Sequence, residues 1–213
     1  MVEDNANPEF ALGFFSVQLG TVKNLTFDDA IVAGELTAIS VGIISGGSLG
    51  VTENCHITNS YVYTGTTGGF VGYQVTYSGA ITGMISIHAN YPGNDGQIYN
   101  CSVDSNTIVY TDSDQHNTGG VVGYIGMFTE VPTKCIVMGC INKGTVKSAL
   151  TNINIEADNS LGGVVGRQDQ CNVIACASTG KVNTTNNVIG YVTENTIPSY
   201  VYASWVPNGG NVY

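Results

Sequence analysis

The stretch GGVVGRQDQCNVIACASTGKV at residues 162–182 decides the fold of this chain, because its parts recur elsewhere. GGVVGY stands at Gly119–Tyr124 and GGFVGY at Gly68–Tyr73. An apolar pair bracketed by glycine that keeps returning is typical of equivalent places in a repeating structure. Anchored on the residue before the apolar pair, six such places follow one another at Gly13, Gly42, Gly69, Gly120, Gly163 and Asn187.

A second set of equivalent positions follows these anchors. Short apolar runs centre on Leu25, Cys55, Cys101, Cys140 and Cys176. Turn-forming residues stand four positions after each centre, and β-branched or aromatic residues stand six positions after it. This spacing is kept in five repeats without a gap, so it predicts one apolar–turn–strand unit used five times, with a degenerate sixth copy near the C-terminus.

One such unit cannot bury its apolar face alone, but it can do so when it is stacked on a copy of itself. We therefore predict an all-β protein, a right-handed parallel β-helix-like solenoid of about six rungs with roughly three short strands each. The third rung carries an insertion and the fourth is longer. We expect the second set of positions to form one internal file. The solenoid should span residues 10–205, after a disordered or vector-derived segment 1–9 and before a C-terminal tail or cap at 206–213.

The composition excludes several classes of function. Charged residues make up 10% of the chain, with six basic against 16 acidic side chains and a net charge of −10. Such an acidic surface repels a phosphate backbone, so nucleic acid is not an expected partner. No run of 18 apolar residues occurs, so no membrane-spanning helix is expected.

The quoted stretch, GGVVGY and LGFFSVQLGTVKNLTF (residues 12–27) together resemble repeats of the GLUG type. These repeats occur in bacterial surface adhesins and as accessory segments of large secreted peptidases. The resemblance implies a β-helix-like solenoid in an exported protein, at the cell surface in association with the outer membrane or the cell wall. Further domains of a larger parent protein are then expected partners.

The cysteines lack the spacing of a zinc site. Cys55, Cys101, Cys140 and Cys176 fit the internal file as small apolar thiols. Cys135 and Cys171 each lie five residues before a cysteine of that file, on adjacent rungs. They are the best candidates for a disulfide, although the spacing leaves open whether they pair.

The sequence offers little for catalysis. Ser48 lies in GGSLG, which fits a nucleophile elbow only between a strand and a helix, and here a further strand is expected to follow. Glycoside hydrolysis needs two carboxylates that face the same bond, but Asp28 and Asp29 are adjacent and point to opposite sides. We therefore expect no enzyme and no cofactor. A polysaccharide-active enzyme is the less favoured alternative.

Asp112 and Asp114 alternate along one strand, and two carboxylates on one side suggest a weak calcium candidate. Calcium needs six or more oxygen ligands, which this segment does not supply alone. A solvated acidic loop is the favoured interpretation.

Tyrosines are the main binding candidates. The third rung inserts residues 74–96, and insertions in solenoids often project from the binding face. Tyr73, Tyr77, Tyr91 and Tyr99 surround this insertion and offer flat apolar faces with a hydroxyl group. They predict a non-catalytic adhesion or ligand-recognition module for a glycan or a host surface protein. The alternative is a structural spacer within a larger exported protein.

Overall fold

The computed structural model describes residues 2–3, 11–34, 39–65, 75–87, 96–127, 135–150, 159–169, 171–183, 187–193 and 200–206. Throughout these ranges the chain forms short strands, and the paired strands run parallel in five sheets, here named A to E. Among the described residues there is no helix of the length and apolar character that a membrane crossing needs.

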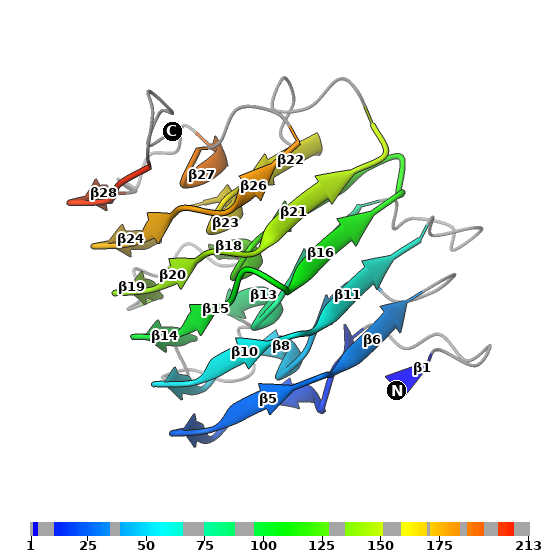
Figure 1. The fold of residues 1–213 in the computed structure, drawn as a ribbon. Helices are drawn as coiled ribbons and strands as arrows, with labels where there is room; N and C mark the ends of the chain where they lie inside the picture. The colour runs from blue at the N-terminus through cyan, green and yellow to red at the C-terminus, as the bar shows by residue number, and fades with distance from the viewer. Residues whose placement is uncertain are drawn as a thin grey trace.

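The five sheets are the walls of one stack (Figure 1). Sheet A contains β1 (Val2–Glu3), β6 (Ile31–Gly34), β11 (Tyr61–Thr64), β16 (Ile108–Thr111), β21 (Thr145–Ser148) and β26 (Lys181–Val182). Sheet B contains β2 (Ala11–Leu12), β7 (Ser40–Gly42), β12 (Thr76–Gly79), β17 (His116–Gly119) and β22 (Asn159–Gly162). Sheet C contains β3 (Phe15–Gln18), β8 (Ser45–Ser48), β13 (Thr82–Ile87), β18 (Val122–Met127), β23 (Val165–Gln168) and β27 (Ile189–Val192).

The last two walls complete each turn of the chain. Sheet D contains β4 (Thr21–Lys23), β9 (Val51–Glu53), β14 (Gln97–Tyr99), β19 (Ile136–Met138), β24 (Asn172–Ile174) and β28 (Tyr200–Tyr202). Sheet E contains β5 (Thr26–Asp28), β10 (His56–Thr58), β15 (Ser102–Val103), β20 (Ile141–Asn142) and β25 (Ala177–Ser178). The chain visits A to E in order, so β1–β5 form the first rung and β26 opens the sixth. In that last rung Trp205 bridges to Ala177 of sheet E.

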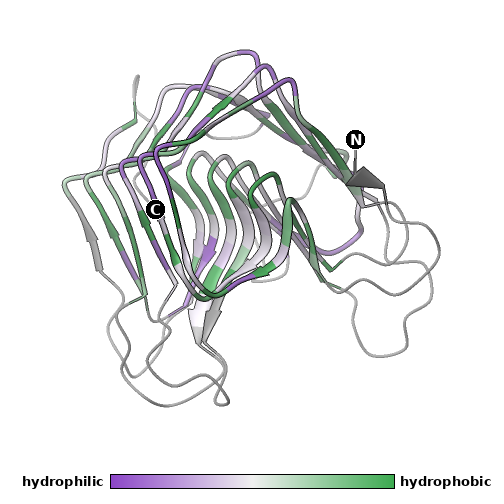
Figure 2. Ribbon diagram, turned by 90° about the horizontal axis from the view of Figure 1, so that it is seen from below, coloured by the Kyte–Doolittle hydropathy of each residue, from purple (hydrophilic) through white to green (hydrophobic). Residues whose placement is uncertain are grey.

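The predicted fold class is confirmed: the chain is an all-β parallel solenoid of six rungs. In Figure 1 it crosses the front of the stack from left to right and rises with each rung, which makes the solenoid right-handed. Viewed along the stack, successive rungs lie one behind another (Figure 2). The stack already includes Val2 and Glu3, which pair with β6 ahead of the expected start at residue 10.

The first five rungs have five strands each rather than the three that the pattern predicted, and three strands of the sixth rung lie among the described residues. The extra corners come from single residues with positive φ that bend the chain between two very short strands. Asn24 (φ 58°) separates β4 from β5, and Asp29 (φ 55°) separates β5 from β6. Asparagine and aspartate tolerate this left-handed conformation better than other non-glycine residues do. Asp29 was correctly predicted as a turn position, but the bend at Asn24 was read as part of one strand.

The register of the glycine phrases needs two corrections. Gly13 and Gly42 align with Gly119 and Gly162, one residue before the anchors that the sequence suggested. GGFVGY at residues 68–73 lies outside the described residues. Its predicted place in the third rung is taken by Gly79 and the strand β13 that follows it.

The recurring glycines are explained by a turn between sheets B and C that packs into the interior. A Cβ atom on Gly42 would lie 2.5 Å from the Ser45 carbonyl oxygen and 2.5 Å from Thr82 Cα of the next rung. A Cβ atom on Gly120 would collide with the side chain of Asn142 in sheet E. Only glycine allows backbone to approach this closely.

The predicted internal file exists, with one exception. Pairing in sheet E aligns Leu25, Cys55, Cys101, Cys140 and Cys176 on successive rungs. The four cysteines are buried free thiols. Leu25 is 47% exposed, because it belongs to the first rung and its strand β5 is the edge of sheet E.

The predicted insertion of the third rung is present as extra chain length, but part of the expected segment belongs to the walls. Residues 75–87 of the expected insertion form β12 and β13, which are wall strands paired on both sides. The rest of that rung's extra length falls at 66–74 and 88–95, outside the described residues.

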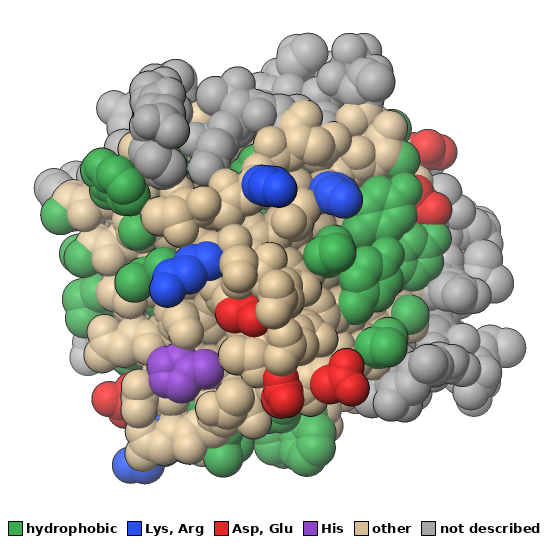
Figure 3. Space-filling model, in the orientation of Figure 1, with side chains coloured by type: hydrophobic (Ala, Val, Ile, Leu, Met, Phe, Trp, Pro, Cys, Tyr) green, Lys and Arg blue, Asp and Glu red, His purple; other side chains and the backbone are tan. Residues whose placement is uncertain are grey.

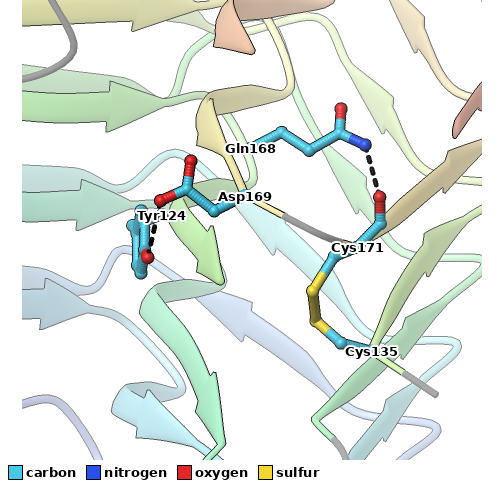
Figure 4. Close-up of a disulfide and its surroundings, with 5 residues drawn as sticks. All are labelled: Tyr124, Cys135, Gln168, Asp169 and Cys171. Atoms are coloured by element: carbon cyan, nitrogen blue, oxygen red, sulfur yellow. Dashed lines mark hydrogen bonds between the residues drawn. A yellow bond between two sulfur atoms is a disulfide. The ribbon is translucent and has the colours of Figure 1, made fainter. Parts of the chain in front are cut away.

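Cys135 and Cys171 form a disulfide between the fourth and fifth rungs (Figure 4). Their Cα atoms are 5.2 Å apart, close to the strand spacing of roughly 4.8 Å that stacked rungs impose. Beside them the Gln168 amide donates a hydrogen bond to the Cys171 carbonyl oxygen. The candidate pairing is therefore made.

Candidate ligand-binding face

Sheet A presents a flat outer surface whose side chains are set by strand alternation. Val62 and Val109 point inward and are buried, so their neighbours along each strand point outward. Pairing between strands arranges the outward residues in two rows along the stack. One row holds Ala33, Tyr63, Tyr110, Lys147 and Asn183, and the other holds Ile31, Tyr61, Ile108, Thr145 and Lys181.

The outward side chains of Tyr61, Tyr63, Ile108 and Tyr110 form what we call the tyrosine face. All four are partly exposed. The rings of Tyr63 and Tyr110 stack, with centroids 5.8 Å apart and planes 27° apart. In the space-filling view a continuous apolar patch covers sheet A over β6, β11 and β16 (Figure 3).

Polar groups border the tyrosine face. The Tyr63 hydroxyl donates a hydrogen bond to Asp112 Oδ2 over 2.7 Å. Partial burial, with the nearby Tyr110 and Asp112, raises the pKa of Tyr61 above its ordinary value. Its phenol therefore stays protonated at neutral pH and can donate a hydrogen bond to a ligand.

Basic side chains lie beside this patch. Lys147 and Lys181, on β21 and β26, are exposed, and Figure 3 shows lysine side chains next to the apolar area. The outward rows of sheet A therefore carry two exposed lysines beside the apolar patch, and Figure 3 shows acidic side chains at the border of the same patch.

Tyr77, one of the predicted binding residues, is partly exposed and packs beside Tyr124. Its ring lies 5.1 Å from that of Tyr124, centroid to centroid. Tyr124 is 6% exposed, and its hydroxyl donates to Asp169 Oδ2 over 2.9 Å (Figure 4). Arg167 pairs with the same carboxylate and lies 5.5 Å from the Tyr124 ring centroid. Burial, with the charge of Asp169, raises the pKa of Tyr124, which is the behaviour of a structural core group.

Of the predicted site residues that the structure describes, Tyr77 and Tyr99 lie on different sheets. Tyr77 lies on β12 of sheet B, whereas Tyr99 lies on β14 of sheet D, where its hydroxyl donates to Gln97 Oε1 over 2.9 Å. Tyr73 and Tyr91 lie outside the described residues.

Sequence reasoning missed the tyrosine face as a site, although a signal for it was present. YVYT at 61–64 and IVYT at 108–111 share one pattern, in which valine alternates with larger outward residues. Such alternation predicts a half-exposed strand, and its recurrence predicts that the outward residues become neighbours.

The two carboxylates of the weak calcium candidate, Asp112 and Asp114, lie between β16 and β17. One Asp112 oxygen accepts the Tyr63 hydroxyl, and Asp114 is exposed. Within the described ranges, no three histidine, cysteine, aspartate or glutamate side chains gather in a way that could hold a metal ion.

A buried serine–histidine pair lies inside the solenoid, with His116 on β17 of sheet B and Ser148 on β21 of sheet A. His116 Nε2 is 2.7 Å from Ser148 Oγ, and their side chains are 0% and 6% exposed. Burial lowers the pKa of His116 to about 4, so the imidazole is neutral at physiological pH. Ser148 Oγ also accepts the Leu150 N–H, and Thr118 Oγ1 lies 3.2 Å from His116 Nδ1. This arrangement completes the hydrogen bonds of an internal polar cluster.

Comparison with known families identifies one segment. The family model of the GLUG motif matches residues 157–183. This chain carries a GLUG motif. The matched residues contain β22, β23, β24, β25 and β26, which is one strand from each of the five sheets. One GLUG motif therefore corresponds to one full turn of the solenoid.

The remaining rungs resemble the GLUG rung in structure. The matched segment contains the glycine turn at Gly162 and the file cysteine Cys176, and both have aligned equivalents in earlier rungs. No curated protein and no solved structure matches the chain.

Proposed function

We propose that this chain is a non-catalytic recognition module of an exported bacterial surface protein, and that it binds a glycan through the tyrosine face. The observation that carries this proposal is the outward stack of Tyr63 and Tyr110 on neighbouring strands. Aromatic rings supply a large apolar area at little cost in conformational entropy, and their hydroxyls provide polar contacts.

The geometry of the face suits a sugar that binds to an open surface better than a small molecule that needs an enclosed pocket. It is a sheet surface, so its ligand must lie flat on it. A pyranose ring has apolar C–H groups that match the parts of the tyrosine rings left exposed by their mutual stacking, and hydroxyl groups that match phenol groups. The hydroxyl of Tyr61, which stays protonated, provides such a partner at the border of the face.

The scaffold supports this role because it holds the rings in place before binding. Strands β11 and β16 are each paired on both sides, and the valines behind them are part of the core. A preorganised face loses little side-chain entropy when a ligand binds.

A glycan array with purified protein tests the proposal. We expect binding to a subset of glycans, and we expect it to be lost in a variant with both Tyr63→Ala and Tyr110→Ala. Tyr99→Ala is the matched control, because Tyr99 is also a partly exposed tyrosine but lies on sheet D. Binding of no glycan, or equal loss in the control, would contradict the proposed site.

A spacer role is the second candidate, and one observation favours it. The stack is continuous over six rungs, and β3, β4 and β5 of the first rung are sheet-edge strands. Such a column can hold two parts of a larger protein apart. Absence of binding by the parent protein to glycans and to surface proteins would favour this role.

A further inference from the structure

The basic residues of this acidic chain are unevenly placed. Of those that the structure describes, Lys143, Lys147 and Lys181 lie on β21, on β26 or at the corner between β20 and β21. Two of them, Lys147 and Lys181, stand in the outward rows of sheet A. Lys147 pairs in register with Tyr110, and Lys181 pairs with Thr145, two residues before Lys147.

No described side chain neutralises the charges of these two lysines. Neither has an ion pair with another described residue, whereas Arg167 is paired with Asp169 at 2.9 Å. Carboxylates on the same side of the molecule keep their negative charge, but they hydrogen-bond to hydroxyl groups and form no ion pair with these lysines. Asp112 accepts from Tyr63, and Asp104 Oδ1 accepts from the Thr107 hydroxyl.

The rows also have a period that suits a linear polysaccharide. Tyr63, Tyr110 and Lys147 stand on three successive strands, spaced by roughly 4.8 Å. This rise is close to the length of one sugar ring. A chain of sugars that runs along the stack can therefore place successive rings over the two tyrosines and the following ring beside Lys147.

We propose that the ligand of this face is a linear polysaccharide that carries carboxylates, as in a uronic acid polymer. Its rings lie over Tyr63 and Tyr110, and its carboxylates are bound by Lys147 and Lys181. This inference rests on the proposed function and adds the chemical class and the direction of the ligand. Lysine suits it because an ammonium group is a compact charge that reaches a carboxylate from a flexible stem.

Matched pairs of oligosaccharides test the inference. Calorimetric titration would compare oligogalacturonate, oligoalginate and hyaluronan fragments with their carboxyl-reduced forms, which keep the rings and lose the charge. We expect the acidic form of at least one backbone to bind about five-fold more tightly than its neutral form, since exposed ion pairs contribute modestly. Added salt should reduce this preference.

Variants separate this inference from the proposed function. Lys147→Ala with Lys181→Ala should remove the preference for the acidic form and leave binding of the neutral form unchanged. Lys23→Ala is the matched control, because it removes an exposed lysine from sheet D. Tyr63→Ala with Tyr110→Ala should abolish binding of both forms.

The outcomes distinguish the proposed glycan-binding face from the inference that its ligand carries carboxylates. Equal affinity for acidic and neutral forms on every backbone overturns the inference, and so does an equal effect of Lys23→Ala. Binding that survives replacement of both tyrosines overturns the proposed face itself. No binding to any acidic probe overturns the inference, while the glycan array still tests the face with neutral ligands.

Discussion

Tyr63 and Tyr110 lie on neighbouring strands of sheet A, with ring centroids 5.8 Å apart, and only Tyr63 hydrogen-bonds to Asp112. The two rings are therefore alike in packing and different in polar contacts. This difference allows the hydroxyl group to be tested separately from the ring.

Tyr63→Phe should lower the free energy of unfolding by about 1 kcal/mol, because it removes a hydrogen bond to a carboxylate at a partly exposed site. The other oxygen of this carboxylate, Asp112 Oδ1, is buried without a hydrogen-bond partner among the described residues. Tyr110→Phe is the control, since its hydroxyl has no hydrogen bond to another described residue. Chemical denaturation of both variants measures the effect, and equal losses would contradict the assignment.

Gly42→Ala should destabilise the protein by about 3 kcal/mol, because the new methyl group would meet backbone atoms in the turn between sheets B and C. Gly20→Ala is a matched control, as a Cβ atom there would have nothing within 4 Å. Thermal unfolding of the two variants should differ clearly. Similar midpoints would show that the turn is looser than the structure indicates.

Native protein should show no reactive thiols, and unfolded protein should show four. The four free cysteines are buried in the file, and the other two form the disulfide. Titration with a thiol reagent, with and without denaturant, counts them directly. Six thiols in unfolded, unreduced protein would mean that Cys135 and Cys171 do not pair.

Replacing both Cys135 and Cys171 with serine should lower the free energy of unfolding by about 3 kcal/mol, because the disulfide closes a loop between residues 36 positions apart. Denaturation in the absence of reductant, compared with the parent protein, measures this loss. A variant as stable as the parent would show that stacking alone holds the two rungs together.

Stability should fall as the pH falls from 6.5 towards 4, in part through His116. Burial lowers the pKa of this imidazole to about 4, so the unfolded chain binds more protons in that window. The histidine contribution is fully present above pH 6.5 and amounts to about 3 kcal/mol. His116→Gln should show a shallower decline of unfolding free energy over the same range. A titration of the His116 ring by NMR with a midpoint near 6.5 would contradict the buried, neutral state.

The prediction of rungs succeeded where the repeat was free of gaps. The file from Cys55 to Cys176 was aligned correctly, because these positions keep a fixed distance to the turns that follow them. The glycine phrases were aligned less well. GGFVGY fits the pattern locally but lies outside the described residues, and Gly79 holds the position aligned with Gly42 and Gly119.

The candidate site was harder to predict than the fold. Tyr77 was chosen for its place near an apparent insertion, and it packs beside Tyr124. Tyr63 and Tyr110 lie outside the expected insertion and were not among the predicted binding residues. To predict that these two tyrosines are neighbours, one must know which residues pair in sheet A. That pairing depends on the number of residues between successive strands, which varies from rung to rung.

By itself the sequence determined that rungs repeat and which side chains turn inward, because both follow from local periodicity and from the residues that allow a bend. Only the tertiary structure decided which outward side chains meet. Tyr63 and Asp112 are 49 residues apart along the chain, and they touch because pairing between strands brings successive rungs into contact. The tyrosine face consists of residues from different rungs, so it exists only because strand pairing places those residues side by side.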